Sequence, residues 1–375
     1  MTVIEYRFIE PLDVLFLRGN KMFGDPGSFG ESLLPPWPSI AAGALRSRML
    51  ADDGVDLTAF ARGDVNHPTL GTPMQPGSFV ITAFHLARHR KDGVLEALTA
   101  PPADLIVSEG RDGNPIVRVL TPTRLAGELM SSAPFALLPV LVEPERSKPA
   151  NGYWLNESGW RKYLAGETPG VADLVKSGEL WALDHRVGVG LDTATRRAAD
   201  GRLFSMQAVA MKSGVGFLAA VTGAIPPNNG TVRLGGDGRA ATIRSVSLDM
   251  PEPDYAAIAR SRRCRLILSA PGIFPEGWKL PGTDQDGNFE FGEIRARITC
   301  AAVQRADIVS GWNLAKWQPK SAQRVAPAGS VYWLDEIEAT PEALRKLAEK
   351  GLWSESCEDM QRRAEGFNCI MFAAY

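Results

Sequence analysis

The sequence predicts an α+β protein of two domains, each built on an antiparallel sheet. A length of 375 residues exceeds the size at which one hydrophobic core stops growing. Strand-like runs recur along the whole chain, with a few helical segments between them. Pro251 and Pro253 interrupt the chain after the last strand-like run of its first part. We therefore expect one domain at residues 1–250 and a second at residues 251–375.

The N-terminal part begins with a strand, a loop and a helix. Residues 3–17 mix alternation with β-branched and aromatic side chains and are interrupted by Pro11, which indicates a bent strand. Pro38 suits the first turn of the helix that follows, because its φ is already helical. Two further strands are expected at residues 78–90 and 103–108. The order is therefore β, α, β, β.

Residues 111–180 are rich in proline, glycine and tryptophan and show no sustained periodicity. We interpret them as an insertion in the first domain, without a predicted fold. Trp154 and Trp160 either contact a partner protein, since aromatic residues are enriched at interface cores, or fill a local core. Two strand-like runs then flank a polar segment that contains arginines. They predict a long β-hairpin at about residues 185–211 with a basic tip.

The C-terminal part has the order strand, crossover, two strands, helix, strand, which is typical of a ferredoxin-like or RRM-like domain. The crossover helix is expected near residues 292–299. The second helix has Thr340 as its N-cap and Pro341 in its first turn, and it ends at Gly351. The expected strands are residues 265–270, 298–309, 330–334 and 370–375.

Composition and charge limit the functional classes. A formal net charge of −2 argues against a protein that coats nucleic acid over its whole surface, so any basic surface must be local. No apolar stretch is long enough to span a membrane, and the first ten residues do not form a signal peptide, so we expect a cytoplasmic protein without membrane contact. The four cysteines are scattered and predict neither a disulfide framework nor a zinc site.

The histidines do not assemble into a recognisable active site. His85 and His89 have metal-ligand spacing only on a helix, and the surrounding residues indicate a strand. His185 or His67 could act as a general acid or base, but no local tyrosine or serine supports such an arrangement. We therefore expect no enzyme activity, no metal and no cofactor.

Glycines between Arg233 and Arg239 form a candidate phosphate site at Gly235, Gly236 and Gly238. No Lys-Ser or Lys-Thr follows, which excludes a Walker A loop, and no helical pattern follows, which excludes a dinucleotide fingerprint. Backbone N–H groups of such a loop can approach phosphate oxygens, and the arginines can add charge-assisted bonds. The alternative is a tight hairpin turn that requires positive φ.

The predicted hairpin combines glycines, arginines and one aromatic residue. Arginine binds phosphate and an aromatic face stacks on an exposed base, so the combination suits an extended RNA strand. The alternative is an exposed hairpin whose aromatic ring lies in the core. The residues concerned are Arg186, Gly188, Gly190, Arg196, Arg197, Arg202 and Phe204.

Several segments, taken in order, are similar to a known family. They are PLDVLFLR, SIAAGALR, HRVGVGLD and RLGGDGR, which begin at residues 11, 39, 185 and 233, followed by SGW and PAGSVY, which begin at residues 310 and 327. Together they resemble the third subunit of the type III-B CRISPR RAMP module, the Cmr complex. The match spans nearly the whole chain.

The resemblance implies two RRM-like domains of the RAMP type, glycine-rich loops and no nuclease activity. It also implies that the chain binds the repeat-derived 5′ handle of the CRISPR RNA (crRNA). The implied protein partners are the large polymerase-like subunit, which is subunit two, and the backbone RAMP subunit, which is subunit four. The RNA-binding candidates that it adds are Arg18, Lys21, Ser39, Arg46, Gly366 and Asn368.

Two other functions remain compatible with the sequence. A RAMP-fold endoribonuclease would process CRISPR transcripts, with His185 or His67 as general acid or base. A protein-only assembly module would use its glycine loops merely to turn the chain. Specific cleavage of repeat RNA by the purified chain would identify the endoribonuclease. RNA crosslinking in the assembled complex that finds no residue of this chain would identify the protein-only module.

Overall fold

The computed structural model describes residues 3–17, 29–110, 113–125, 131, 133–143, 147–235, 238–313, 316, 318–357 and 359–375. The chain forms two compact units. Unit 1 comprises Met1–Leu95, Gly178–Ser247 and Ile308–Gln323, and unit 2 comprises Glu96–Ser177, Leu248–Asp307 and Arg324–Tyr375.

One unit boundary lies close to the expected one, and another does not. The chain passes from unit 1 to unit 2 between Ser247 and Leu248, next to the prolines that suggested a boundary. Residues 111–180, however, were expected to be an insertion in the first domain, and nearly all of them belong to unit 2. The physical reason is a buried layer that packs on the C-terminal sheet, described below.

Unit 1 contains an antiparallel sheet in the order β14-β15-β1-β13-β3, and β4, which follows β3 in the sheet order, begins at Leu95, the last residue of that segment of unit 1. Its inner strand β1 pairs with both β13 and β15, and Phe8 and Ile9 on this strand are fully buried. The expected strands at residues 3–17 and 78–90 are therefore present. The bounds are β1 (Glu5–Pro11), β3 (Val80–His89), β4 (Leu95–Leu98), β13 (Val215–Thr222), β14 (Asn229–Leu234) and β15 (Arg239–Val246).

Two helices of unit 1 follow local sequence signals. Helix α1 (Ser39–Asp52) begins directly after Pro38, as expected, and buries Ala41, Leu45 and Met49 at helical spacing. Helix α2 (Leu57–Arg62) begins at Asp56, whose carboxylate accepts the backbone N–H groups of the first turn.

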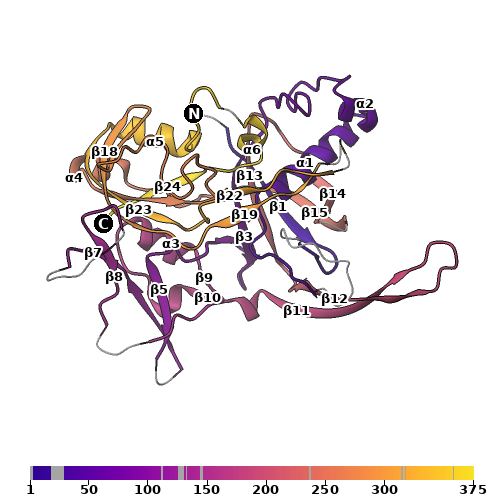
Figure 1. Ribbon diagram of the computed structural model, residues 1–375, viewed down its shortest axis with the longest axis horizontal. Coiled ribbons are helices and arrows are strands. Elements are labelled where there is room, and N and C mark those ends of the chain that lie inside the picture. Colours follow the sequence, from indigo (N-terminus) through magenta and orange to yellow (C-terminus); the bar gives the residue numbers. More distant parts are fainter. Residues whose placement is uncertain are drawn as a thin grey trace. The chain divides into compact units, whose positions relative to one another are not determined.

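The expected hairpin is confirmed as β11 (Trp181–Leu191) and β12 (Ala198–Met211), which pair antiparallel. The proximal end of β12 is fixed within unit 1, because Val209 exchanges two backbone hydrogen bonds of 2.8 Å with Leu15. The short strand β2 (Phe29–Gly30) pairs with β12 in parallel. The distal end of the hairpin extends away from the sheet of its own unit (Figure 1).

Unit 2 is built on an antiparallel sheet in the order β17-β18-β23-β16-β24. Every residue of the central strand β16 is buried, because helices cover both faces of the sheet. One face packs on α4 and α5, and the other packs on α3. The bounds are α3 (Glu157–Leu164), α4 (Tyr255–Ser261), β16 (Cys264–Leu268), β17 (Asn288–Phe291), β18 (Ile294–Ala302), β23 (Val331–Glu338), α5 (Pro341–Lys350), α6 (Met360–Ala364) and β24 (Ile370–Ala373).

The stretch without a predicted fold forms the second covering layer of this sheet. Trp160 and Tyr163 of α3 lie in one buried cluster with Ile267 and Trp333 of the sheet. Trp154 and Trp160 are both buried, so they fill a local core, and the interpretation of these residues as an exposed docking surface was wrong. Of the two alternatives, the local core is the one observed.

The C-terminal helix was predicted well and the crossover helix was not. Helix α5 has Thr340 as its N-cap, Pro341 in its first turn and Gly351 at its end. The expected crossover helix near residues 292–299 is instead strand β18, whose side chains alternate between buried and exposed. No helix lies in residues 269–293, all of which are described, so the chain lacks a helix that a ferredoxin-like order requires there.

Short elements complete the described chain. No helix in the described ranges is long and apolar enough to cross a membrane. The remaining elements are β5 (Leu105–Glu109), β6 (Pro115–Val119), β7 (Thr121–Thr123), β8 (Leu138–Val140), β9 (Tyr153–Leu155), β10 (Leu174–Lys176), β19 (Asp307–Val309), β20 (Trp312–Asn313), β21 (Gln318–Pro319), β22 (Gln323–Val325) and the 3₁₀ turns η1 (Val171–Asp173) and η2 (Ser177–Glu179).

A buried polar cluster joins α3 and the turn before β5 to the sheet of unit 2. Arg265, on the central strand β16, donates from Nη1 to Asp104 Oδ2 at 2.9 Å, and the hydroxyl of Tyr163 donates to Asp104 Oδ1 at 2.7 Å. The guanidinium carbon of Arg265 lies 4.1 Å from the centre of the Tyr163 ring. Burial, and then the Asp104 carboxylate, raise the pKa of Tyr163 well above its ordinary value, so its hydroxyl remains a donor.

We expect Asp104→Ala to destabilise the chain by about 3–5 kcal/mol, because it leaves the buried guanidinium of Arg265 without its carboxylate. Urea denaturation followed by circular dichroism measures this loss. Glu293→Ala is the control, since it removes an exposed ion pair with Lys346 and should leave the unfolding midpoint unchanged. Equal stability of Asp104→Ala and the unaltered chain would contradict the assignment.

Candidate nucleic-acid interface

The tip of the β11–β12 hairpin is closed by one carboxylate. Asp192 Oδ1 accepts hydrogen bonds from the backbone N–H of Thr195 at 2.7 Å, from the Thr195 hydroxyl at 2.8 Å and from the N–H of Ala194 at 3.1 Å. These bonds, led by the one from the Thr195 amide, lower the pKa of Asp192. The carboxylate is therefore occupied by the turn that it organises.

The two arginines at the tip point into solvent. Arg196 and Arg197 are exposed and make no ion pair within the described part of the chain. Arg196 has a φ of 54°, in the left-handed region, and its backbone N–H donates to the carbonyl of Asp192 at 2.8 Å. Asp192 forms no ion pair with Arg197, and its side chain bonds to Ala194 and Thr195 instead.

Glycines on β11 make room for larger side chains on β12. A Cβ at Gly188 would lie 2.5 Å from Cζ of Phe204, and a Cβ at Gly190 would lie 3.0 Å from two side-chain carbons of Arg202. The Phe204 ring and the Arg202 stem therefore lie flat across the partner strand. Phe204 is half-buried, so the ring is neither enclosed in a core nor fully exposed.

The two faces of the hairpin differ in chemistry. On the face that carries Phe204, Arg186 forms an exposed ion pair of 2.8 Å with Asp184. The opposite face exposes large apolar side chains to solvent, and we call it the apolar hairpin face. It comprises Leu183, Val187, Val189, Leu191 and Leu203.

The glycine-rich segment is a turn between β14 and β15 of unit 1. Gly235 and Gly238 have φ values of 77° and 60°, and the N–H of Gly238 donates to the carbonyl of Gly235 at 3.2 Å. The requirement for positive φ is thus real, and it is compatible with phosphate binding. Arg233 is exposed without an ion pair among the described residues, whereas Arg239 pairs with Asp13 at 3.0 Å.

Of the remaining candidates in the N-terminal part of the chain, some lie within the described residues and some do not. Ser39 and Arg46 lie on α1, as expected, and both are half-buried. Arg18, Lys21 and Gly236 lie outside the described residues.

Gly366 and Asn368 lie in unit 2, and the structure contradicts a direct RNA contact for Asn368. Asn368 is only 2% exposed. Its Oδ1 accepts the backbone N–H of Ile273 at 2.6 Å, and its Nδ2 donates to the carbonyl of Leu352 at 3.1 Å. The side chain thus ties two loops together, and Gly366, with a φ of 89°, supplies the preceding turn.

Neither histidine candidate is placed in a catalytic group. His67 is buried, its Nδ1 accepts the backbone N–H groups of Thr69 and Leu70, and its Nε2 donates to Asp53 at 2.8 Å. His185 is exposed on β11, where its ring stacks with Phe29 at 6.4 Å between centres. Among the described residues no three acidic, histidine or cysteine side chains could hold a metal ion.

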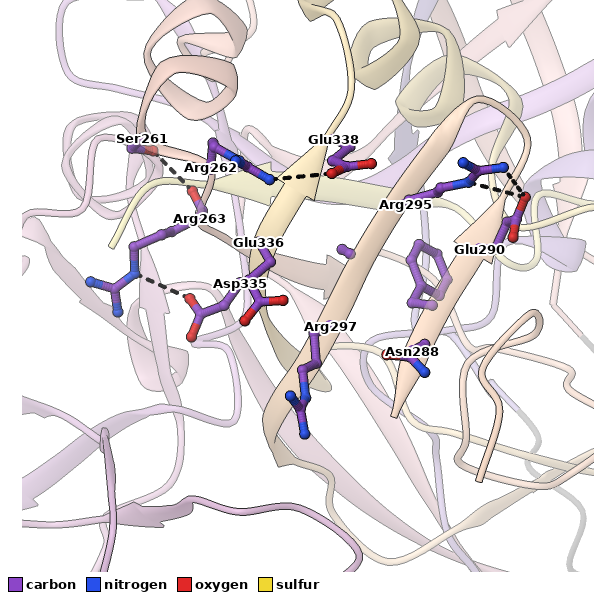
Figure 2. Close-up of a pocket in the computed structure, with 12 residues that line it drawn as sticks. Ser261, Arg262, Arg263, Asn288, Glu290, Arg295, Arg297, Asp335, Glu336 and Glu338 are labelled. Carbon is purple, nitrogen blue, oxygen red and sulfur yellow. Dashed lines mark hydrogen bonds and ion pairs between the residues drawn. The ribbon is translucent and has the colours of Figure 1, made fainter. Parts of the chain in front are cut away.

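A second concentration of arginine was missed as a site. Four arginines from two separate segments, the end of α4 and strand β18, line an open groove in unit 2 (Figure 2). Only the short run around Arg262 and Arg263 was visible as a cluster in the sequence, because Arg295 and Arg297 come from another strand. The pairing of β18 with β23 was the missing information.

Comparisons with known proteins identify the family. The family model for CRISPR-associated protein (Cas_Cmr3) matches residues 7–373. A search of curated proteins found no match. A chain in a cryo-EM structure of the type III-B Cmr-beta bound to cognate target RNA is similar, with 14% identity, a TM-score of 0.50, and 98% of this chain and 96% of that chain covered. A chain of Cmr-beta bound to cognate target RNA and AMPPnP has 14% identity, a TM-score of 0.47, and coverage of 96% and 93%. The chain therefore belongs to the Cas_Cmr3 family of CRISPR-associated proteins, as the third subunit of the type III-B Cmr complex.

Proposed function

We propose that this chain is a non-catalytic, RNA-binding RAMP subunit that holds the 5′ handle of the crRNA on the basic face and tip of the β11–β12 hairpin. The observation that carries the proposal is the pair of exposed tip arginines without carboxylate partners. Arg196 and Arg197 stand beside a turn whose one acidic side chain, Asp192, is held by backbone amides. Cations in this state can neutralise phosphates without first breaking an ion pair.

The flattened face of the hairpin supports the same ligand. The Phe204 ring lies over Gly188, which offers a platform for one unstacked base, and the Arg202 stem lies over Gly190 beside it. Arg233 adds an exposed cation at the β14–β15 turn of the same unit. A short handle needs only such a local basic surface, which is compatible with the net charge of −2.

We propose protein partners for the same subunit. The large polymerase-like subunit, subunit two, and the backbone RAMP subunit, subunit four, are the candidates from the family resemblance. The apolar hairpin face supports a protein contact, because contiguous exposed apolar side chains on a soluble chain mark interaction surfaces. We place this subunit in the cytoplasm, in antiviral defence.

Loss of one tip arginine should weaken RNA binding without unfolding the chain. For Arg197→Ala we expect lower affinity for handle RNA and a salt dependence flatter by about one unit of slope, because one phosphate contact is lost. Arg239→Ala should have a smaller effect, since this arginine is already paired with Asp13. Fluorescence anisotropy at several salt concentrations, with melting temperatures beside it, measures both.

The control for these variants is Arg305→Ala, which removes an exposed arginine of unit 2 that has no ion pair in the described chain. It should leave affinity and salt slope unchanged. Unaltered affinity in Arg197→Ala would place the RNA on another face.

The aromatic platform makes a separate prediction. Phe204→Ala should cost about 1–3 kcal/mol of RNA binding, the range for one base stacked on an aromatic ring. Gly188→Ala should weaken binding in the same direction, because the new Cβ would lie 2.5 Å from the ring and displace it. Leu203→Ala, on the apolar hairpin face, is the matched control and should not change affinity. A Phe204→Ala variant that binds normally would remove the stacking role.

The alternative function is a RAMP-fold endoribonuclease with His185 as its acid or base. We expect repeat RNA to stay intact when it is incubated with the purified chain without metal, because the His185 ring makes no hydrogen bond with a described group and stacks on Phe29. Gel electrophoresis of labelled RNA measures this. Specific cleavage that His185→Ala abolishes would establish the nuclease.

A further inference from the structure

The groove in unit 2 is lined by three structural segments (Figure 2). The end of α4 supplies Arg262 and Arg263, the β17–β18 hairpin supplies Arg295 and Arg297, and β23 supplies acidic residues. The groove has a volume of about 820 Å³ and is open to solvent. We call it the mixed-charge groove, and its acidic side chains are Glu290, Asp335, Glu336 and Glu338.

The backbone at this groove is held in an uncommon conformation. Arg262 and Glu336 each have a φ of 56°, although neither is glycine. β18 pairs Arg295 with Glu338 and Arg297 with Asp335, so β23 carries one extra residue between these pairs. Such a bulge redirects a side chain, here that of Glu336, and non-glycine residues with positive φ gather at functional sites.

Arg262 fixes this bulge from the neighbouring segment. Its carbonyl accepts the N–H of Ile337 at 3.1 Å, and its Nε donates to the carbonyl of Ile337 at 3.1 Å. These two bonds hold Ile337, the residue after Glu336, through its N–H and its carbonyl, so they fix the backbone of the bulge. The strain is retained in a part of the sheet where a glycine would have relieved it.

The charges of the mixed-charge groove are balanced but not fully paired. The pairs are Arg262 with Glu338 at 3.5 Å, Arg263 with Asp335 at 3.1 Å, and Arg295 with Glu290 at 3.2 Å. Arg297 and Glu336 are exposed, and neither makes an ion pair within the described ranges. The groove therefore presents one free cation and one free anion.

This balance distinguishes the groove from the hairpin. Four carboxylates beside four guanidinium groups provide no net attraction for a phosphate backbone, and a free carboxylate repels it. A protein segment that carries one acidic and one basic side chain matches the free pair, because complementary charges fix register and exclude other partners.

We propose that the mixed-charge groove docks another protein subunit of the Cmr complex, through a segment that presents a carboxylate to Arg297 and an ammonium or guanidinium group to Glu336. The groove is made of other residues than the hairpin, and the inference does not depend on RNA binding at the hairpin. It assigns a role to the strained bulge at Glu336.

Reversal of either free charge tests the groove in the assembled complex. The full complex is coexpressed with Arg297→Glu or with Glu336→Lys, and native mass spectrometry measures how much of the variant chain is incorporated. We expect each reversal to lower incorporation about tenfold, because like charges then face each other. Arg305→Glu and Glu349→Lys, exposed charges of unit 2 outside the groove, should be incorporated normally.

Two further measurements keep a folding defect from imitating this result. Glu336→Gly keeps the positive φ and removes the charge, so it should keep its melting temperature while its incorporation falls. In the unaltered chain, amide hydrogen exchange across Asp335–Glu338 should slow when the complex assembles.

Three outcomes would overturn the proposal. They are normal incorporation of both reversal variants, unchanged exchange across β23 on assembly, and crosslinking of crRNA to Arg295 or Arg297. Failure of the hairpin proposal would give a different result. In that case complexes that contain Arg197→Ala would carry a normal amount of crRNA.

Discussion

The ion pair between Arg265 and Asp104 is the constraint on which unit 2 depends. Strand β16 is buried on both faces, so alternate residues along it face two apolar layers. Arg265 occupies an inward position in one of them, where a guanidinium without a carboxylate would cost several kcal/mol. Asp104, 161 residues earlier in the chain, removes most of that cost by accepting a hydrogen bond from the guanidinium on one carboxylate oxygen. The Tyr163 hydroxyl donates to the other oxygen. The sheet of the C-terminal part therefore requires the earlier segment Glu96–Ser177 as its cover.

This dependence explains which parts of the fold were predictable. Helix α5 follows from its cap, its proline and its terminal glycine, all within a dozen residues, and α1 and the hairpin follow from equally local patterns. The unit to which residues 111–180 belong is a long-range property, because it depends on contacts between distant segments, such as the one between Arg265 and Asp104, that no local pattern shows. The error at residues 292–299 has a different cause. Strand β18 alternates exposed arginines with buried apolar residues, which is the periodicity of a strand. The expected crossover helix therefore followed the ferredoxin-like order of elements and not this local pattern.

At the candidate interface, too, local patterns alone did not show what single residues do. Gly188 and Gly190 were recognised as part of an RNA-binding pattern, and the structure supplies their physical reason, which is space for Phe204 and Arg202 across the strand pair. Asn368 was placed in the same pattern because of its position before the last strand. Its amide is instead consumed by two backbone groups inside unit 2. A glycine or asparagine near a turn is compatible with RNA contact and with a purely structural role. Only the burial of the residue in the structure distinguishes these two roles.

The hairpin tip and the mixed-charge groove are both rich in arginine, but they differ in chemistry because the carboxylates beside the arginines have different partners. At the hairpin tip, turn amides hold the carboxylate of Asp192 and lower its pKa, so it stays ionised but is partly compensated by those donors. The carboxylate accepts hydrogen bonds from the turn and does not pair with the tip arginines, so these arginines keep their attraction for phosphate. In the mixed-charge groove, arginines and carboxylates pair with each other directly, and the surplus is one charge of each sign. Net charge and arginine count are therefore poor guides to the ligand of such a surface, because the partner of each carboxylate decides whether the cations beside it remain available.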